Sequence, residues 1–249
     1  MEKSDWSEIV SQATKAPLSG ALWRVVESQI DIATNDLVDT LEEQAALEIM
    51  LEDSKPPVPE VASDIDYLLA TPFRYPPLNW GSRFGSKNEA SLYYGSQEYA
   101  TAFAELAYYR FVFRSAMDTE FPNPRISTNH TLFSANYEFL PGIDLTVAPF
   151  RNYSSLLADK SNYSASQSLG QVLRSENIQG FYFLSARCPD KGTNIAIFTP
   201  QGLRSKAPEL RYQCYCEMIK NQVTIKLNEE LFVFPRAVFL VKGQLPAPA

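Results

Sequence analysis

Short apolar runs that suit β-strands dominate the second half of the sequence and limit the folds open to this chain most strongly. A strand needs only about four to eight such residues, whereas a helix shows a longer 3.6-residue period. Helices are predicted over residues 96–117 and 166–174. The predicted strands cover residues 132–139, 180–185, 194–198, 223–227, 231–234 and 237–241. A few helices followed by many short strands predict an α+β fold with antiparallel sheets.

The N-terminal quarter follows another pattern, with apolar residues at three- and four-residue steps. These residues are Leu22, Val26, Ile30, Ala33, Leu37 and Leu41. Such spacing places side chains on one face of a helix. The pattern stops at residues 55–59, where three prolines forbid further helix and favour an extended linker. The sequence therefore predicts an N-terminal helical extension with a proline-rich linker over residues 1–64, and a main domain over residues 65–249.

Net charge and apolar run lengths exclude several classes of partner. The 249 residues carry a net charge of −7. Proteins that bind phosphate backbones or anionic membranes normally present a basic face. No apolar run approaches the ~20 residues needed to span a bilayer, and residues 1–5 lack the apolar core of a secretory signal. We expect a cytoplasmic protein that binds neither nucleic acid directly nor a membrane.

Cysteine and histidine content argues against a metal site. The three cysteines, Cys188, Cys214 and Cys216, form no disulfide framework, and the Cys-x-Cys spacing does not suit zinc. Residues 212–216 are rich in aromatic and small apolar residues and suit a strand. The single histidine, His130, cannot build a multi-histidine site, and no Gly-x-Ser-x-Gly motif indicates a hydrolase triad. We expect no metal.

Two arginines, two adjacent tyrosines and a glutamate stand out within about thirty residues. They are Arg74, Arg83, Tyr93, Tyr94 and Glu105. Guanidinium groups bind phosphate oxygens bidentately, and aromatic rings stack on flat heterocycles. The set therefore suits an anionic, aromatic ligand. Arginines near aromatic rings are also common as stacked surface pairs, so this segment alone leaves a ligand site and a solvated surface both open.

Several short motifs, taken in order, resemble the RES domain of bacterial toxin–antitoxin pairs. The motifs are Gly81-Ser82-Arg83, Leu92-Tyr93, Ala102-Phe103-Ala104-Glu105, Ser185-Ala186-Arg187 after the run 180–184, the strand-like run 194–198 that follows, and the weaker middle matches 143–146 and 167–170. The resemblance spans Asp66 to Pro200, about half of the chain. Where family members often have tryptophan and asparagine, this chain has Phe84-Gly85. The spacing from Tyr93 to Glu105 is one residue longer than in the family, so Tyr94 is the alternative match.

This resemblance implies a fold, an activity and a partner. The fold is similar to ADP-ribosyltransferases, with split β-sheets around an NAD cleft. The activity is that of a toxin that cleaves the nicotinamide–ribose bond of NAD, by phosphorolysis or hydrolysis, and so depletes NAD. NAD is then a substrate, with inorganic phosphate as a co-substrate of phosphorolysis, and no cofactor is needed. The partner is an Xre-family antitoxin, which blocks the cleft and supplies the DNA-binding part of the complex.

The resemblance also assigns roles to individual residues. The candidate catalytic residues are Arg83, Tyr93, Glu105 and Ser185, and the candidate substrate-binding residues are Arg74, Tyr94 and Arg187. Glu105 would face the oxocarbenium charge that develops on the ribose. Arg83, helped by Arg74, would hold the pyrophosphate or an incoming phosphate. One of the two tyrosines would stack on nicotinamide, and Ser185 would bond its amide or the ribose.

Two other functions fit the same sequence. The first is transfer of ADP-ribose to a protein, which would use the same cleft with a protein nucleophile. The second is a catalytically silent module that binds a partner through its N-terminal helices. The Arg–Tyr–Glu–Ser set argues against the silent module, because a purely structural domain has no need of all four.

Overall fold

The protein, described by a computed structural model, has defined structure for residues 3–28, 38–117 and 125–247. The α-helices are α1 (Lys3–Gln12), α2 (Leu41–Ser54), α3 (Tyr67–Arg74), α4 (Tyr99–Ser115), α5 (Ser154–Leu157) and α6 (Ser164–Ser175). The strands are β1 (Ala16–Glu27), β2 (Tyr93–Ser96), β3 (Ile126–Asp144), β4 (Gly180–Leu184), β5 (Thr193–Ile197), β6 (Leu210–Ile219), β7 (Gln222–Leu227) and β8 (Glu230–Pro235). Short 3₁₀ helices are η2 (Glu60–Ala62), η3 (Phe150–Tyr153), η4 (Pro200–Gly202) and η5 (Arg236–Phe239).

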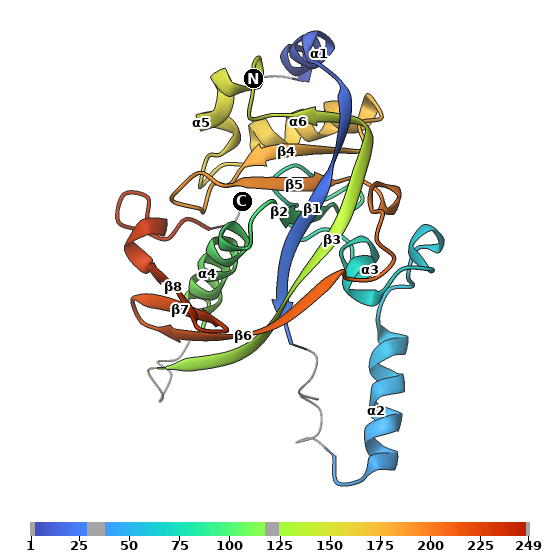
Figure 1. The fold of residues 1–249 in the computed structure, drawn as a ribbon, viewed down its shortest axis with the longest axis vertical. Helices are drawn as coiled ribbons and strands as arrows, with labels where there is room; N and C mark the ends of the chain where they lie inside the picture. Colours follow the sequence, from blue (N-terminus) through green and yellow to red (C-terminus); the bar gives the residue numbers. More distant parts are fainter. Residues whose placement is uncertain (1–2, 29–37, 118–124, 248–249) are drawn as a thin grey trace.

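All of these strands belong to one mixed sheet, in the order β1-β2-β5-β4-β3-β6-β7-β8 (Figure 1). β3 and β4 pair in parallel, and the other neighbours pair antiparallel. β1 also pairs with β3 along almost its whole length, from Ala16↔Gly142 to Glu27↔His130. Strands β1, β2, β5, β4 and β3 therefore form a closed circuit, and β6, β7 and β8 continue outward from β3. The α+β class is confirmed, but the described strands form one continuous mixed sheet, whereas antiparallel sheets split around a cleft were expected.

The N-terminal segment corrects the sequence prediction, because residues 16–27 form a strand and not a helix. Leu22 and Val26 are four residues apart, and this interval places side chains on one face of either a helix or a strand. Both contact the same apolar cluster, which Leu18 joins at the same interval. The odd-numbered Trp23 and Val25 pack into a different cluster on the other face. The spacing of these residues fits both a helix and a strand, and pairing with β3 selects the strand.

Most of the other predicted strands are present in the structure. The strands expected around residues 132–139, 180–185, 194–198, 223–227 and 231–234 are present, as is the strand over 212–216. The strand expected over residues 237–241 is wrong, because most of it forms η5. The helical prediction holds for α2, while Ile30, Ala33 and Leu37 lie outside the described residues. The division between residues 64 and 65 stays a prediction, although β1 takes part in the sheet of the main domain.

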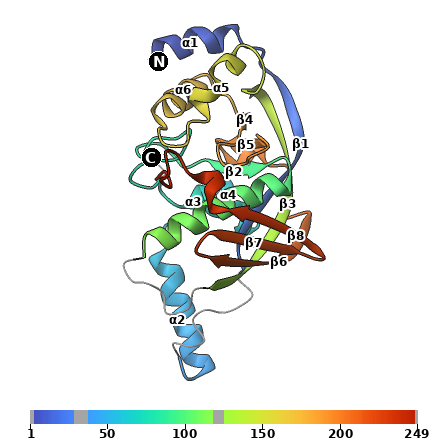
Figure 2. The same cartoon turned by 90° about the vertical axis from the view of Figure 1, so that its left-hand side faces the viewer.

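Three apolar clusters hold the layers together. The helices and strands that contribute to them can be followed in Figures 1 and 2. One joins α1 and α6 to the outer face of β4 and β5 through residues such as Trp6, Leu169 and Phe181. A second joins α4 to β6 and β7 through residues such as Phe103 and Ile225. In the third, side chains from the other face of the five-strand circuit pack against α3. Among the described residues, no helix combines the length and apolarity needed to cross a membrane.

Helix α6 also holds the loop that precedes β2. Gln167 donates through Nε2 to the carbonyl oxygens of Trp80 and Ser82, both at 3.0 Å. One turn later, Gly170 lets the loop approach so closely that a Cβ would lie 1.9 Å from the carbonyl oxygen of Phe84. The neighbouring Arg83 is therefore placed by direct contact between this loop and α6.

We expect Gly170→Ala to lower the free energy of unfolding by about 1–3 kcal/mol, because the backbone must move to admit the methyl group. Helix propensity alone predicts the opposite sign, since alanine is favoured over glycine by about 1 kcal/mol in a helix interior. Urea unfolding of Gly170→Ala and of Gln171→Ala, a control on the same helix, separates the two effects. A Gly170→Ala protein as stable as the wild type would mean that the loop can withdraw without loss.

Candidate active site

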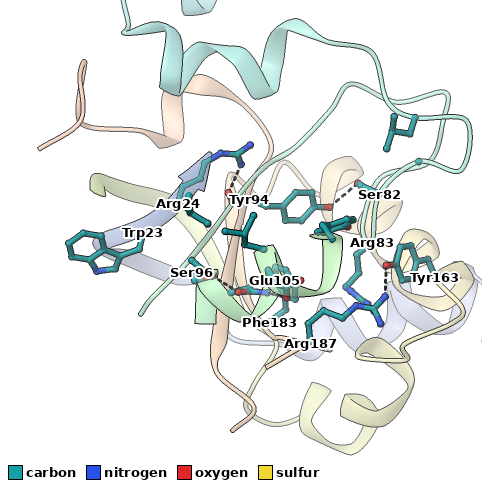
Figure 3. Close-up of a pocket in the computed structure, with 18 of the residues that line it drawn as sticks. Trp23, Arg24, Ser82, Arg83, Tyr94, Ser96, Glu105, Tyr163, Phe183 and Arg187 are labelled. Atoms are coloured by element: carbon teal, nitrogen blue, oxygen red, sulfur yellow. Dashed lines mark hydrogen bonds between the residues drawn. The ribbon is translucent and has the colours of Figure 1, made fainter. Parts of the chain in front are cut away.

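A cleft of about 350 Å³ opens between β1, β2 and α4 (Figure 3). β1 and β2 pair only at Trp23↔Ser96, so the two strands separate on leaving this point. The loop before β2 and residues at the ends of β4 and β5 complete the walls. The side chains that line it include four of the residues predicted from the sequence: Arg83, Tyr94, Glu105 and Arg187.

Glu105 projects from α4 into the cleft and is held by two hydrogen bonds. Ser185 donates through Oγ at 2.6 Å, and Asn194 donates through Nδ2 at 2.8 Å. Both donors meet the same carboxylate oxygen, Oε1. Within the described part of the chain nothing donates to Oε2, which leaves this oxygen available to a ligand.

Ser185 has no hydrogen-bonding capacity left for a ligand. Its hydroxyl donates a hydrogen bond to Glu105. Its oxygen accepts hydrogen bonds from the backbone N–H groups of Arg187 at 3.1 Å and Cys188 at 2.9 Å. A hydroxyl offers one donor and two acceptor positions, so all three are used. This geometry indicates that Ser185 orients Glu105 and fixes the turn after β4. The predicted hydrogen bond from Ser185 to a substrate finds no support in this arrangement.

Three arginines line the cleft, and none of them forms an ion pair with a carboxylate among the described residues. Arg83 donates to the carbonyl oxygens of Leu157 and Asp159 at 3.1 and 2.8 Å. Arg24 donates to the carbonyl oxygen of Tyr94 at 2.6 Å, across the gap between β1 and β2. Burial lowers the pKa of Arg24, as expected for a cation removed from water without a carboxylate partner.

Arg187 is the most enclosed of these three arginines, with 3% of its surface exposed. Its guanidinium lies 3.6 Å above the ring of Tyr108, and Nη2 donates to Lys160 O and to the hydroxyl of Tyr163. Nη1 is buried without a hydrogen-bond partner in the described residues. Arg83 lies over the ring of the same Tyr163 at 4.3 Å, so the two arginines flank one tyrosine. A pair of cations with an unsatisfied donor favours an anionic ligand.

The two adjacent tyrosines point to opposite faces of β2, as side chains in a strand alternate. Tyr94 lines the cleft, and its hydroxyl contacts Ser82 Oγ at 2.9 Å and accepts the N–H of Phe84 at 3.1 Å. Burial raises the pKa of Tyr94 to about 12, so its phenol stays protonated near neutral pH. Tyr93 is fully buried in the cluster beneath α3, stacked on Phe73. The structure therefore places Tyr94 in the cleft and Tyr93 outside it.

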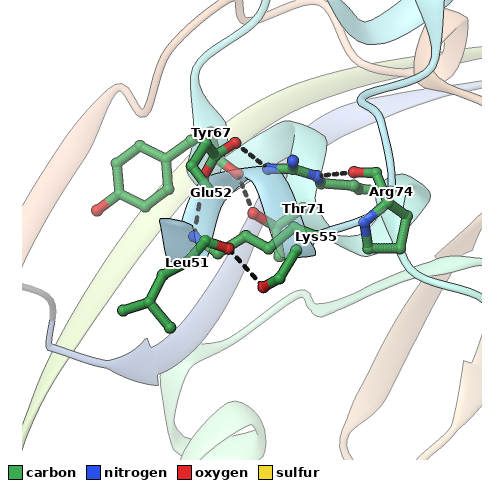
Figure 4. A network of polar contacts seen from close by, with 8 residues as sticks. Leu51, Glu52, Lys55, Tyr67, Thr71 and Arg74 are labelled. Atoms are coloured by element: carbon green, nitrogen blue, oxygen red, sulfur yellow. Dashed lines mark hydrogen bonds and ion pairs between the residues drawn. The ribbon is translucent and has the colours of Figure 1, made fainter. Parts of the chain in front are cut away.

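Arg74 is not among the residues that line the cleft. It is the last residue of α3, and its guanidinium donates to Glu52 Oε1 at 2.7 Å and to the carbonyl oxygen of Pro56. These contacts join α3 to the end of α2 and to the proline-rich segment (Figure 4). The expected sharing of a phosphate between Arg74 and Arg83 finds no support in this arrangement, because only Arg83 reaches the cleft.

Four further residues line the cleft that were not predicted from the sequence: Arg24, Ser96, Tyr163 and Asn194. Arg24 was hidden because its strand was interpreted as a helix. Ser96 was included in the helix predicted over residues 96–117, but it lies in β2, and α4 begins only after Glu98. Its hydroxyl donates to Asn194. A buried asparagine in an otherwise apolar strand was the one available signal for Asn194. No group of three or more metal-ligating side chains occurs in the residues that the structure describes.

Comparison with known proteins gives a family match and similar solved structures. A family model described as RES domain matches residues 57–216, which include Arg83, Tyr94, Glu105, Ser185 and Asn194. None of the curated proteins matches the sequence. Among solved structures, the crystal structure of the M. tuberculosis MbcT–MbcA toxin–antitoxin complex is similar at 11% identity and a TM-score of 0.48, covering 94% of this chain and 93% of that chain.

The hydroxyls of the two tyrosines should differ in their effect on stability. We expect Tyr94→Phe to lower the free energy of unfolding by about 1–3 kcal/mol, because it leaves the buried N–H of Phe84 without an acceptor. Tyr93→Phe should be neutral or stabilising, since the Tyr93 hydroxyl is buried without a partner among the described residues. Urea unfolding of the two variants measures the difference directly, and a larger loss for Tyr93→Phe would contradict the assigned orientations.

Proposed function

The chain belongs to the RES domain family, and from the chemistry of its cleft we propose that it cleaves the nicotinamide–ribose bond of NAD as the toxin of a toxin–antitoxin pair. Phosphate or water is the acceptor. The observation that carries this proposal is a single carboxylate, Glu105, held by two donors in a cleft whose three arginines lack carboxylate partners. NAD depletion would be the toxic effect.

The charge of the cleft supports a ligand with a pyrophosphate group. Among the described residues, three arginines and one carboxylate line the cleft, so the cleft has an excess of positive charge although the whole chain is acidic. Arginine forks suit phosphate oxygens, and Nη1 of the enclosed Arg187 is buried without a hydrogen-bond partner among the described residues. A volume of about 350 Å³ is within the ordinary range of small-molecule sites.

One carboxylate is enough for the proposed reaction. Ordinary glycosidases use two, because one must protonate an alkoxide leaving group. Nicotinamide leaves NAD as a neutral molecule, so no general acid is required. Glu105 accepts a hydrogen bond from a ribose hydroxyl through Oε2 and faces the oxocarbenium charge. At ~4 Å and an effective dielectric constant of ~20, the attraction is of order 4 kcal/mol.

The other cleft residues have supporting roles in this proposal. Arg83 and Arg187 hold the pyrophosphate or the incoming phosphate, and Tyr94 contributes an aromatic wall. Ser185 orients Glu105 by a hydrogen bond and does not bind the substrate, since its hydroxyl makes all of its hydrogen bonds within the protein. Arg74 and Tyr93 have no part in catalysis, because neither reaches the cleft.

The partner in this proposal is an Xre-family antitoxin, as the family resemblance implies. An antitoxin that inserts into the cleft would meet the exposed aromatic Trp80 and Tyr109 on its walls, together with the cationic side chains. A partner that supplies the DNA-binding surface also agrees with the net charge of −7 on this chain.

We expect the purified chain, free of antitoxin, to consume NAD. Products should be identified by mass after incubation with and without inorganic phosphate. Nicotinamide with a phosphorylated ADP-ribose, formed only when phosphate is present, would establish phosphorolysis, and free ADP-ribose in both buffers would establish hydrolysis. Intact NAD after incubation with folded protein would refute the proposal, and ADP-ribose attached to protein would indicate a transferase.

Glu105→Gln should fold normally and lose roughly a thousandfold in kcat, if the carboxylate attraction acts only in the transition state. The substituted amide can still accept from Ser185 and Asn194 through its oxygen, so the local structure has no reason to change. Glu98→Gln, an exposed residue just before the same helix, is the matched control. A Glu105→Gln protein with wild-type kcat would exclude the proposed role.

A further inference from the structure

Three polar side chains that line the cleft, from three different elements, form a continuous hydrogen-bonded chain. Ser96 of β2 donates through Oγ to Asn194 Oδ1 at 2.7 Å. Asn194 of β5 donates through Nδ2 to Glu105 Oε1 at 2.8 Å. Ser96 and Asn194 are directly opposite in the antiparallel β2–β5 pair, and they are 3% and 5% exposed. The backbone register therefore fixes the distance between these two buried groups.

We propose that Asn194, held in place by Ser96, is the positioning residue that directs the catalytic carboxylate of Glu105 toward the substrate. This inference rests on the proposed NAD cleavage. Neither Ser96 nor Asn194 acts on the substrate in this mechanism. Their effect is transmitted through Oε1 of Glu105.

The direction of the hydrogen bonds explains why both residues are needed. A carboxylate oxygen only accepts, so Asn194 must turn its NH₂ group toward Glu105 and its carbonyl oxygen away. That carbonyl oxygen is buried and needs a donor of its own, which the Ser96 hydroxyl supplies. Without Ser96, the amide has an unsatisfied oxygen and one partner fewer to hold its plane. Ser96 thus stabilises the one amide orientation that can donate to the carboxylate.

Two donors on one oxygen also fix how the carboxylate plane is rotated. Ser185 approaches Oε1 from the turn after β4, and Asn194 approaches it from β5. With both in place, Oε2 remains the oxygen that a ribose hydroxyl can reach. With Asn194 removed, a single hydrogen bond holds the carboxylate, and it can rotate about its last side-chain bond. Catalysis depends on such preorganisation more than substrate binding does, because the arginines and aromatic walls still hold the ligand.

Kinetics of four variants test this inference in the full chain. We expect Asn194→Leu to lower kcat by about tenfold to a hundredfold, with a KM for NAD close to the wild-type value. Ser96→Ala should give a smaller loss of kcat, and Ser96→Thr, which keeps the hydroxyl, should restore most of it. Tyr182→Phe is the control, because it removes a hydrogen bond between neighbouring strands, to Tyr137, without touching Glu105.

All variants should first be shown to be folded by their unfolding curves. A role confined to strand pairing would lower stability in Asn194→Leu and leave the kcat of the folded protein unchanged. Wild-type kcat in folded Asn194→Leu, or a rise in KM at constant kcat, would overturn the inference.

A second measurement needs no turnover. The ¹⁵N–¹H signals of the Asn194 side-chain amide can be assigned by their loss in Asn194→Leu. We expect them to shift and to lose protection from solvent exchange in Glu105→Ala and in Ser96→Ala, but not in Tyr182→Phe. Unchanged signals in the first two variants would overturn the inference. Shifted signals in a protein that leaves NAD intact would support the positioning role while refuting the proposed substrate.

Discussion

The antiparallel pairing of β1 with β3 is the contact on which the cleft depends. It joins a strand near the N-terminus to one that lies more than a hundred residues later, and it closes the circuit of five strands. Once β1 follows β3, it can meet the short β2 at a single position and must then diverge from it. Arg24 bridges the resulting gap with a hydrogen bond to the backbone of Tyr94. The cleft is therefore a consequence of how the circuit closes.

Preorganisation of this cleft comes from hydrogen bonds and close packing. The Tyr94 hydroxyl and Gln167 hold the loop that presents Arg83, and Gly170 lets that loop lie directly on α6. Buried cations without carboxylate partners are costly in an apoprotein, because desolvation is not offset. Keeping Arg24, Arg83 and Arg187 on carbonyl oxygens and aromatic rings reduces this cost and leaves their charge for a ligand.

Much of the architecture and part of the site could be predicted from the sequence alone. Short apolar runs predicted the α+β class and most of the strands, because a half-buried strand needs only local apolar side chains. The motif residues Arg83, Glu105 and Arg187 were identified and do meet in one cleft, with Ser185 bonded to Glu105. Residue type and order along the chain carried this information, since guanidinium, carboxylate and hydroxyl groups have fixed chemistry wherever the fold places them.

Only the tertiary structure decided the features that depend on a partner distant in the sequence. The four-residue spacing of Leu22 and Val26 fits a helix and a strand equally, and pairing with β3 selects the strand. Tyr93 and Tyr94 are neighbours of the same type, and the register of β2 against β5 determines which of them faces the cleft. Asn194 gains its significance from Glu105, 89 residues away. Local sequence sets what each side chain can do, but non-local pairing sets which side chains meet.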